Sequence, residues 1–335
     1  MSKLSSIFPL LAILALSSCA GTPATPTWAG STAAMRDAFP ESEFIALQGR
    51  GATRATAEAD GTAAIARFFN SEVTSRIAVL ERGWEGAGGS GSRSETEAEI
   101  FVQSQMQLFA VRHATDAYFD KAGREWVTVA YINRAEAWQV HEPRFRQQAE
   151  TFYRLFEVAE NERDPFRKAL RFTSAQDFAR SPDFQGAVSM GQLLFPVRMG
   201  ANFSQVSQYL AALPEMAADT RRNATVFIEI DSDFESIVYT AFSRKLASLG
   251  FPVSNNRNAA AVCTVTVEEG RQDRQLGIFY FPKVQATITS PAGTLSTFSA
   301  EGEQQSAVTP DVAKRRAYQS LATAVANDFS LQTGL

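Results

Sequence analysis

The sequence has few of the residues that build metal or nucleophilic sites, with only two cysteines and two histidines among 335 residues. His113 and His141 stand apart from each other and from Cys263, so the ligand spacing of a zinc site is missing. The other cysteine, Cys19, is assigned to lipidation below. No intramolecular disulfide is therefore expected, and stability must come from packing.

The sequence also lacks a large excess of either charge. It has 32 Lys and Arg against 36 Asp and Glu, spread along the chain, so no basic face is available to neutralise a phosphate backbone. We expect no nucleic-acid partner. Hydrophobic residues make up 45% of the chain and include 25 Phe, which excludes a disordered or low-complexity polymer. The length allows two or three domains.

Long apolar runs are missing, with the clearest run extending only from Ile7 to Leu16. Ten residues are too few for a membrane-spanning helix, which needs about 20. The run follows Lys3 and precedes small residues, an order typical of a cleaved signal peptide. We therefore assign residues 1–18 to a signal peptide.

The signal peptide ends in Leu16-Ser17-Ser18-Cys19, which resembles the bacterial lipobox. In a lipobox the small residues fit the signal peptidase, and the cysteine sulfur receives diacylglycerol. The alternative is an ordinary secretory signal followed by an incidental cysteine. Ala20 is not the Asp that retains lipoproteins at the inner membrane of enteric-type bacteria, so we expect the outer membrane, with the chain facing the periplasm. Residues 19–34 then form a lipidated tether whose first part is stiff and polar.

Periodicity predicts a first α+β domain over residues 35–137. Its connection at residues 120–123 is typical of a hairpin, and residues 83–91 form a Gly/Ser-rich loop. The expected elements are a strand at Phe44–Leu47, an alanine-striped helix at Arg54–Phe69, a strand at Glu72–Leu80, a helix at Glu97–Gln107, and strands at Phe109–Phe119 and Glu125–Arg134.

A helical bridge is expected over residues 138–222. An apolar stripe begins at Phe145, and Asp164-Pro165 and Ser181-Pro182 each place an N-cap residue before a proline.

A second α+β domain in the order βαβββα is expected over residues 223–335. Gly250 ends its first helix, and turns are expected at Arg271–Arg274 and Pro291–Gly293. The expected elements are strands at Thr225–Ile230, Val262–Glu268, Gly277–Ser290 and Leu295–Glu303, and helices at Phe234–Leu249 and Pro310–Phe329. The predicted fold class is thus α+β: two small domains, with antiparallel sheets packed by alanine-striped helices, joined by a helical segment.

Two segments of the first domain resemble a known family. FPESEFIALQGRG (residues 39–51), the alanine-striped helix after it and AYINRAEA (residues 130–137) are similar to Lpp-twenty-like bacterial lipoproteins over about residues 35–140. That domain is also similar to the N-terminal module of flagellar outer-membrane assembly proteins. In the match, Gly49 and Gly51 correspond to the family turn and Arg134 to its terminal arginine. The resemblance implies an envelope lipoprotein with no established catalytic residues, envelope or flagellar assembly partners and a ring-forming homo-oligomer.

Two motifs suggest ligand chemistry but have simpler structural explanations. Gly49-Arg50-Gly51 is similar to a dinucleotide fingerprint, yet Arg54 occupies the third glycine position, so a tight turn and close helix packing explain both glycines better. Asp231-Ser232-Asp233 could hold Mg²⁺ or Ca²⁺ through its carboxylates. The preferred interpretation is a capping box in which Ser232 and Glu235 close the start of a helix.

Hydrolase chemistry is also weakly supported. Ala187-Val188-Ser189-Met190-Gly191 is close to a G-x-S-x-G nucleophile elbow, but both histidines precede Ser189, the reverse of the hydrolase order. Pro143 directly after His141-Glu142 is expected to prevent a metal-binding helix. The apolar stretch 186–200 is interpreted as inter-domain core, with a partner-binding or lipid-facing patch as the alternative.

These observations favour an outer-membrane-anchored lipoprotein acting as a non-enzymatic structural or assembly module of the envelope. Its membrane partner is reached through lipid on Cys19, and no catalytic, metal or cofactor site is expected. The alternatives are a periplasmic module that binds peptidoglycan, lipid or a peptide, and an enzyme whose site is built from acidic residues.

Overall fold

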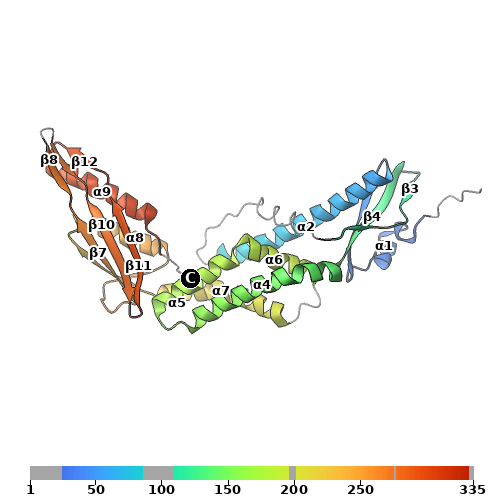
Figure 1. Ribbon diagram of the computed structural model, residues 1–335, viewed down its shortest axis with the longest axis horizontal. Helices are drawn as coiled ribbons and strands as arrows, with labels where there is room; N and C mark the ends of the chain where they lie inside the picture. The colour runs from blue at the N-terminus through green and yellow to red at the C-terminus, as the bar shows by residue number, and fades with distance from the viewer. Residues whose placement is uncertain (1–24, 86–108, 196–200, 275–276, 332–335) are drawn as a thin grey trace, which may run out of the picture. The chain divides into compact units, whose positions relative to one another are not determined.

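The computed structural model describes residues 25–85, 109–195, 201–274 and 277–331 (Figure 1). The chain packs as two compact units, the first made of Met1–Ala64 with Val111–Tyr131 and the second of the remaining residues. Cys19, the predicted helix at Glu97–Gln107 and most of the predicted loop at 83–91 lie outside the described residues. The domain boundaries at 137 and 222 stay predictions. Helices and largely antiparallel sheets confirm the α+β fold class.

The first unit is a small sheet with helices. Its elements are η1 (Thr27–Ala29), α1 (Thr32–Ala38), β1 (Phe44–Gly51), the start of α2 (Arg54–Glu85), β2 (Arg112–His113), β3 (Tyr118–Asp120) and most of β4 (Glu125–Asn133). The strand order is β1-β4-β2, and β3 also pairs with β4. Asp120 lies opposite Glu125, which confirms the predicted hairpin. The predicted strand 109–119 is wrong as one element, because only β2 and β3 pair with β4 there.

The predicted strand at Glu72–Leu80 is also wrong, since α2 continues through it to Glu85. Ile65, Phe69 and Val73 are buried at a spacing of four, which is a helical period. Val79, expected on the same strand face as Val73, is 58% exposed. Alternating β-branched residues suggested a strand, but the four-residue stripe of buried side chains decides the conformation.

Besides the rest of α2, the second unit contains a group of four helices: α4 (Arg134–Asn161), α5 (Pro165–Ala179), α6 (Pro182–Leu194) and α7 (Ala201–Asn223). Their shared core is rich in Phe. Asp164 and Ser181 accept hydrogen bonds at the starts of α5 and α6, which confirms both predicted N-caps. Helix α4 begins earlier than the stripe from Phe145 predicted, because Asn133 caps it.

Pro143 lies inside α4, contrary to the prediction that it would prevent a helix there. A proline removes one backbone hydrogen bond from a helix. The buried side chains of Ala137, His141, Phe145 and Ala149 continue at a spacing of four through this point. Packing along that stripe therefore outweighs the local cost of the proline.

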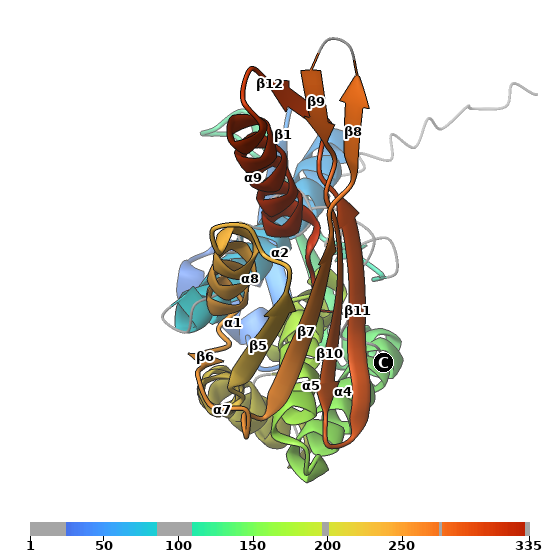
Figure 2. The same cartoon turned by 90° about the vertical axis from the view of Figure 1, so that its left-hand side faces the viewer.

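The rest of the second unit is a sheet covered by two helices. Its elements are β5 (Val226–Asp231), α8 (Ile237–Ser248), β6 (Val253–Ser254), β7 (Ala261–Glu268), β8 (Arg271–Arg274), β9 (Gly277–Tyr280), β10 (Lys283–Ser290), β11 (Gly293–Glu301), β12 (Gln305–Ala307) and α9 (Pro310–Asp328). The larger sheet has the order β11-β10-β7-β5-β6, and α8 and α9 lie on the same face of it (Figure 2). A three-stranded sheet has the order β12-β9-β8.

Several expectations for this region need correction. Strand β5 is parallel to β6 and β7, so the larger sheet is mixed, not purely antiparallel. The turn expected at Arg271–Arg274 is strand β8, paired with β9. The single strand expected at Gly277–Ser290 is divided into β9 and β10 at Phe281 and Pro282, and β9 and β10 belong to different sheets. Gly250 follows α8 with a φ of 86°, which confirms it as the C-terminal glycine of the helix.

Candidate functional site

Trp28, which stands nine residues after Cys19 in the sequence, is packed into the first unit. The Trp28 side chain is 3% exposed, and its Nε1 donates to Asp116 Oδ1 at 2.9 Å. Its ring packs edge-on against Tyr118 of β3, with centroids 5.6 Å apart. Trp28 therefore joins the chain to the β3–β4 hairpin. The tether predicted over residues 19–34 is wrong in its last part, because η1 and the start of α1 are folded there. Sequence analysis did not identify this contact, because it joins residues 88 positions apart.

The β3–β4 hairpin carries an exposed aromatic pair. Phe119 lies opposite Trp126 in the register, and their ring centroids are 6.0 Å apart. Phe119 is 44% exposed and Trp126 is half-buried. Lys121 and Arg124 lie exposed in the connection between the strands. The sequence indicated the hairpin, and the cross-strand register could have shown that these two rings meet.

Gly49 and Gly51 lie in β1, not in the turn predicted for them. A Cβ atom on Gly49 would stand 2.1 Å from the Ala57 carbonyl oxygen, and one on Gly51 would stand 2.6 Å from the Ala57 amide nitrogen. The strand thus runs directly against the backbone of α2. Close packing of strand and helix accounts for both glycines, as the sequence suggested.

The acidic segment after β5 is used to start α8. The two carboxylate oxygens of Asp233 accept from the amides of Val238 and Tyr239, at 3.1 and 2.8 Å. The predicted capping box of Ser232 and Glu235 is therefore wrong. Glu235 instead forms two hydrogen bonds with Arg315, at 2.9 and 2.6 Å, and this partner lowers the pKa of Glu235. Among the described residues, no group of three or more His, Cys, Asp or Glu side chains is placed to hold a metal ion.

Ser189 and His141 are buried in the helical region. Ser189 lies inside α6, and its side chain has no exposed surface, so it does not stand on a strand-to-helix elbow. His141 lies in α4, and its Nε2 donates to the carbonyl oxygen of Ala187 in α6 at 2.9 Å. Burial lowers the pKa of His141 to about 4, which keeps the ring neutral at pH 7.

His113 and the apolar stretch also have structural roles. His113 Nε2 lies 2.9 Å from the Glu58 carbonyl oxygen and 3.1 Å from the Thr62 hydroxyl, which joins β2 to α2. From residue 186 to 194, every side chain but Gln192 is buried, consistent with the core interpretation of this stretch. Residues 196–200 lie outside the described residues.

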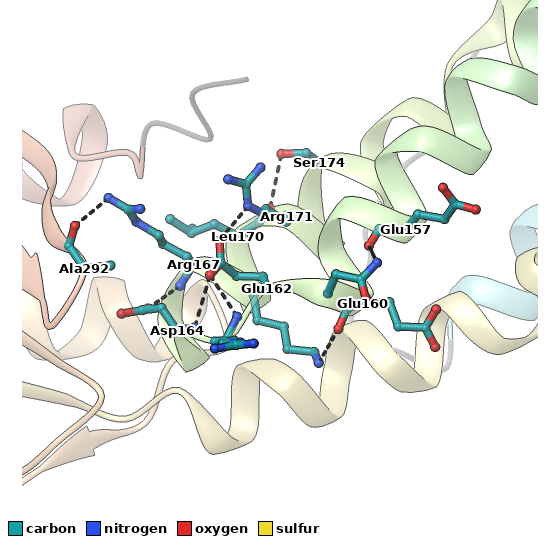
Figure 3. Close-up of polar contacts among 12 residues, drawn as sticks. Glu157, Glu160, Glu162, Asp164, Arg167, Leu170, Arg171, Ser174 and Ala292 are labelled. Carbon is teal, nitrogen blue, oxygen red and sulfur yellow. Dashed lines mark hydrogen bonds and ion pairs between the residues drawn. The ribbon is translucent and has the colours of Figure 1, made fainter.

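A polar network fixes the junction between α4 and α5 (Figure 3). Glu162 accepts from the amides of Arg163 and Asp164 and pairs with Arg171 at 2.9 Å. These hydrogen bonds, opposed by desolvation, lower the pKa of Glu162. Arg167 donates to the carbonyl oxygen of Ala292 in the turn between β10 and β11, at 2.9 Å (Figure 3). The network joins the end of α4 to the start of α5 and, through Arg167, to the β10–β11 turn.

A surface groove of about 650 Å³ lies between α8 and α9. Its lining includes Ile237, Ala241, Ala322 and Arg244. Lys245 Nζ donates to the Ala326 carbonyl oxygen at 2.7 Å and links the two helices. The groove combines small apolar side chains with hydroxyl and cationic groups, which suits a small amphipathic ligand. The sequence carries no local signal for the groove, because the groove depends on the packing of two helices far apart in the chain.

None of the described helices is long and apolar enough to cross a membrane. No protein-family model and no curated protein matches the chain significantly. The resemblance to Lpp-twenty-like lipoproteins therefore stays a prediction.

Three solved structures are similar to the chain at low identity. A minor lipoprotein of Acinetobacter baumannii is 16% identical, over 31% of this chain and 90% of that one, with a TM-score of 0.23. A lipoprotein of Neisseria meningitidis is 17% identical, over 31% and 96%, with a TM-score of 0.21. A secreted protein of Helicobacter pylori is 13% identical, over 86% and 99%, with a TM-score of 0.31. Similarity this weak does not assign a function.

Proposed function

We propose that this protein is an outer-membrane-anchored lipoprotein that acts as a non-enzymatic structural or assembly module of the bacterial envelope. The observation that carries the proposal is the position of Cys19: it follows a signal-like apolar run and lies nine residues before Trp28, which is buried in the first unit. A lipid on Cys19 would thus hold the first unit close to the bilayer.

The energetics of acyl chains support stable anchoring. Each buried CH₂ group contributes about 0.8 kcal/mol, and one chain alone gives only marginal binding, whereas two or more hold a protein at the membrane. A diacylglycerol on the Cys19 sulfur brings two chains. No membrane-spanning helix is needed for this attachment.

The contacts made by the candidate catalytic side chains support a non-enzymatic role. His141 bonds a helix carbonyl, Ser189 is enclosed in α6, and Asp233 caps α8. Each is used for packing or hydrogen bonding within the fold. None of the three lines the groove between α8 and α9.

Fractionation of cells producing the full precursor tests the proposal. The wild-type chain and a Cys263→Ala control should sediment with outer-membrane vesicles after a high-salt wash, and Cys19→Ser should become soluble in the periplasm. The control matches the loss of a thiol at the buried cysteine. A soluble wild-type chain, or a Cys19→Ser chain that sediments as before, would contradict the proposal.

The groove between α8 and α9 favours a second candidate function, a periplasmic module that binds a peptide, lipid or glycan fragment. Native mass spectrometry of the chain purified from envelopes tests it. A bound molecule that is lost in Ala322→Trp, which fills the groove, would support this function. A chain that carries no such molecule would leave only the anchored structural role.

A further inference from the structure

The aromatic pair of the β3–β4 hairpin is unusual for a water-exposed surface. Phe119 leaves 44% of its surface in solvent although Trp126 packs against it across the strands. Tyr118, the preceding residue, points to the opposite face and contacts Trp28 in the small core of the first unit. The hairpin therefore has one face fixed to the fold and one face that presents aromatic surface.

Cations flank this aromatic surface. Lys121 and Arg124 are exposed in the connection, and no described acidic side chain lies within salt-bridge distance of either. The acidic groups of the hairpin have other partners. Asp116 accepts from Trp28, Asp120 accepts from the Ala122 amide, and Glu125 pairs with Arg50 at 2.7 Å.

The chain that precedes the hairpin sets the distance to the predicted anchor. Nine residue steps from Cys19 to Trp28 span at most about 30 Å when fully extended. Trp28 itself contacts the hairpin at Tyr118 and Asp116. A lipid on Cys19 would thus keep the hairpin within reach of the bilayer.

We propose that the β3–β4 hairpin is a second membrane contact, which places Phe119 and Trp126 in the interface of an anionic bilayer and Lys121 and Arg124 among its headgroups. Aromatic rings favour the membrane–water interface, and each nearby Lys or Arg is attracted to anionic lipid. The anchor raises the local concentration of the hairpin at the bilayer, so a weak contact suffices. The inference rests on the proposed lipidation of Cys19 for this concentration effect.

Fluorescence quenching in proteoliposomes tests the contact. The full lipidated chain is placed in vesicles of phosphatidylethanolamine and phosphatidylglycerol with bromine on the acyl chains near the interface. The emission of Trp126 is obtained as the difference between the wild type and Trp126→Phe. We expect this emission to be quenched about twofold or more, and Phe119→Ser to abolish most of the quenching. Val308→Ser is the matched control, because Val308 is fully exposed outside the hairpin.

The role of the two cations can be tested in the same quenching experiment. Replacing Lys121 and Arg124 together by Gln should weaken the quenching in anionic vesicles and leave it unchanged in phosphatidylcholine vesicles. Trp126 emission that is unquenched in anionic vesicles would overturn the inference, whatever the state of Cys19. If Cys19 carries no lipid, the proposed function fails instead. In that case the same vesicles are added to the unacylated chain, up to millimolar lipid, to test the hairpin without an anchor. Absence of Trp126 quenching in this titration would overturn the proposed membrane contact.

Discussion

Burial keeps His141 uncharged at neutral pH and makes it a source of acid sensitivity. Its pKa is lowered from 6.5 to about 4 in the fold, so a proton binds more tightly to the unfolded chain. The contribution of neutral His141 to the free energy of unfolding is therefore complete above pH 6.5 and is lost as the pH falls through about 4. The expected loss of unfolding free energy from this group is about 3 kcal/mol between pH 7 and pH 4.

Urea unfolding at several pH values tests this expectation. Carboxylates such as Glu162 also lose stabilising interactions in acid, so the comparison is between the wild type and His141→Gln. The variant retains an N–H donor for the Ala187 carbonyl oxygen and cannot titrate. Its unfolding free energy should fall less than that of the wild type over the same pH range. Parallel pH profiles would show that His141 is not responsible.

Cys263 should be chemically inert in the folded protein. It has no exposed surface, and burial raises the pKa of its thiol to about 12, so the reactive thiolate is scarce at pH 7. In the Cys19→Ser chain, where Cys263 is the only cysteine, a thiol reagent should not react in buffer and should label one thiol in denaturing urea. Rapid labelling in buffer would show that the C-terminal sheet opens readily.

At the scale of elements, the start of α8 distinguishes the observed cap from the predicted one. The carboxylate of Asp233 accepts from two backbone amides, whereas the Ser232 hydroxyl donates to Asp231 and to no helix amide among the described residues. Asp233→Ala should lower the unfolding free energy by about 1–2 kcal/mol, and Ser232→Ala should change it by less than about 0.5 kcal/mol. Thermal or urea unfolding gives both values. Equal losses of unfolding free energy in the two variants would show that Ser232 caps the helix as the sequence predicted.

The contact between β1 and α2 depends on the absence of a side chain at Gly49. A Cβ there would meet backbone atoms, which cannot move aside as a flexible side chain can. Gly49→Ala should cost about 3 kcal/mol, at the upper end of overpacking effects. Gly30→Ala is the control, because its Cβ would lie 3.6 Å from the nearest atom. A small cost at Gly49 would show that the strand and helix can separate without loss.

The ends of several helices could be predicted from residues adjacent in the sequence. The N-caps Asp164 and Ser181 and the glycine after α8 depend only on neighbours in the sequence. The continuation of α2 was missed because Val73, Ile77 and Val79 also fit a strand period, and burial of one helical stripe decided between them. The parallel pairing of β5 and the strand β8 depend on distant partners, which composition does not reveal.

For the molecule as a whole, the sequence predicts the cellular location more directly than it predicts a functional surface. Cys19 is identified by a local motif, and that motif is sufficient to predict an envelope location. The hairpin surface and the groove between α8 and α9 needed the structure, because each is formed by segments that meet only in the fold. Both are consistent with an anchored module that works through its surfaces.

The lipidation of Cys19 can be measured on the mature chain extracted from membranes, by its intact mass and by sequencing of its N-terminal peptide. We expect a chain that begins at Cys19 and carries the added mass of diacylglycerol on the sulfur. A chain that begins at another residue, or an unmodified Cys19, would contradict this expectation.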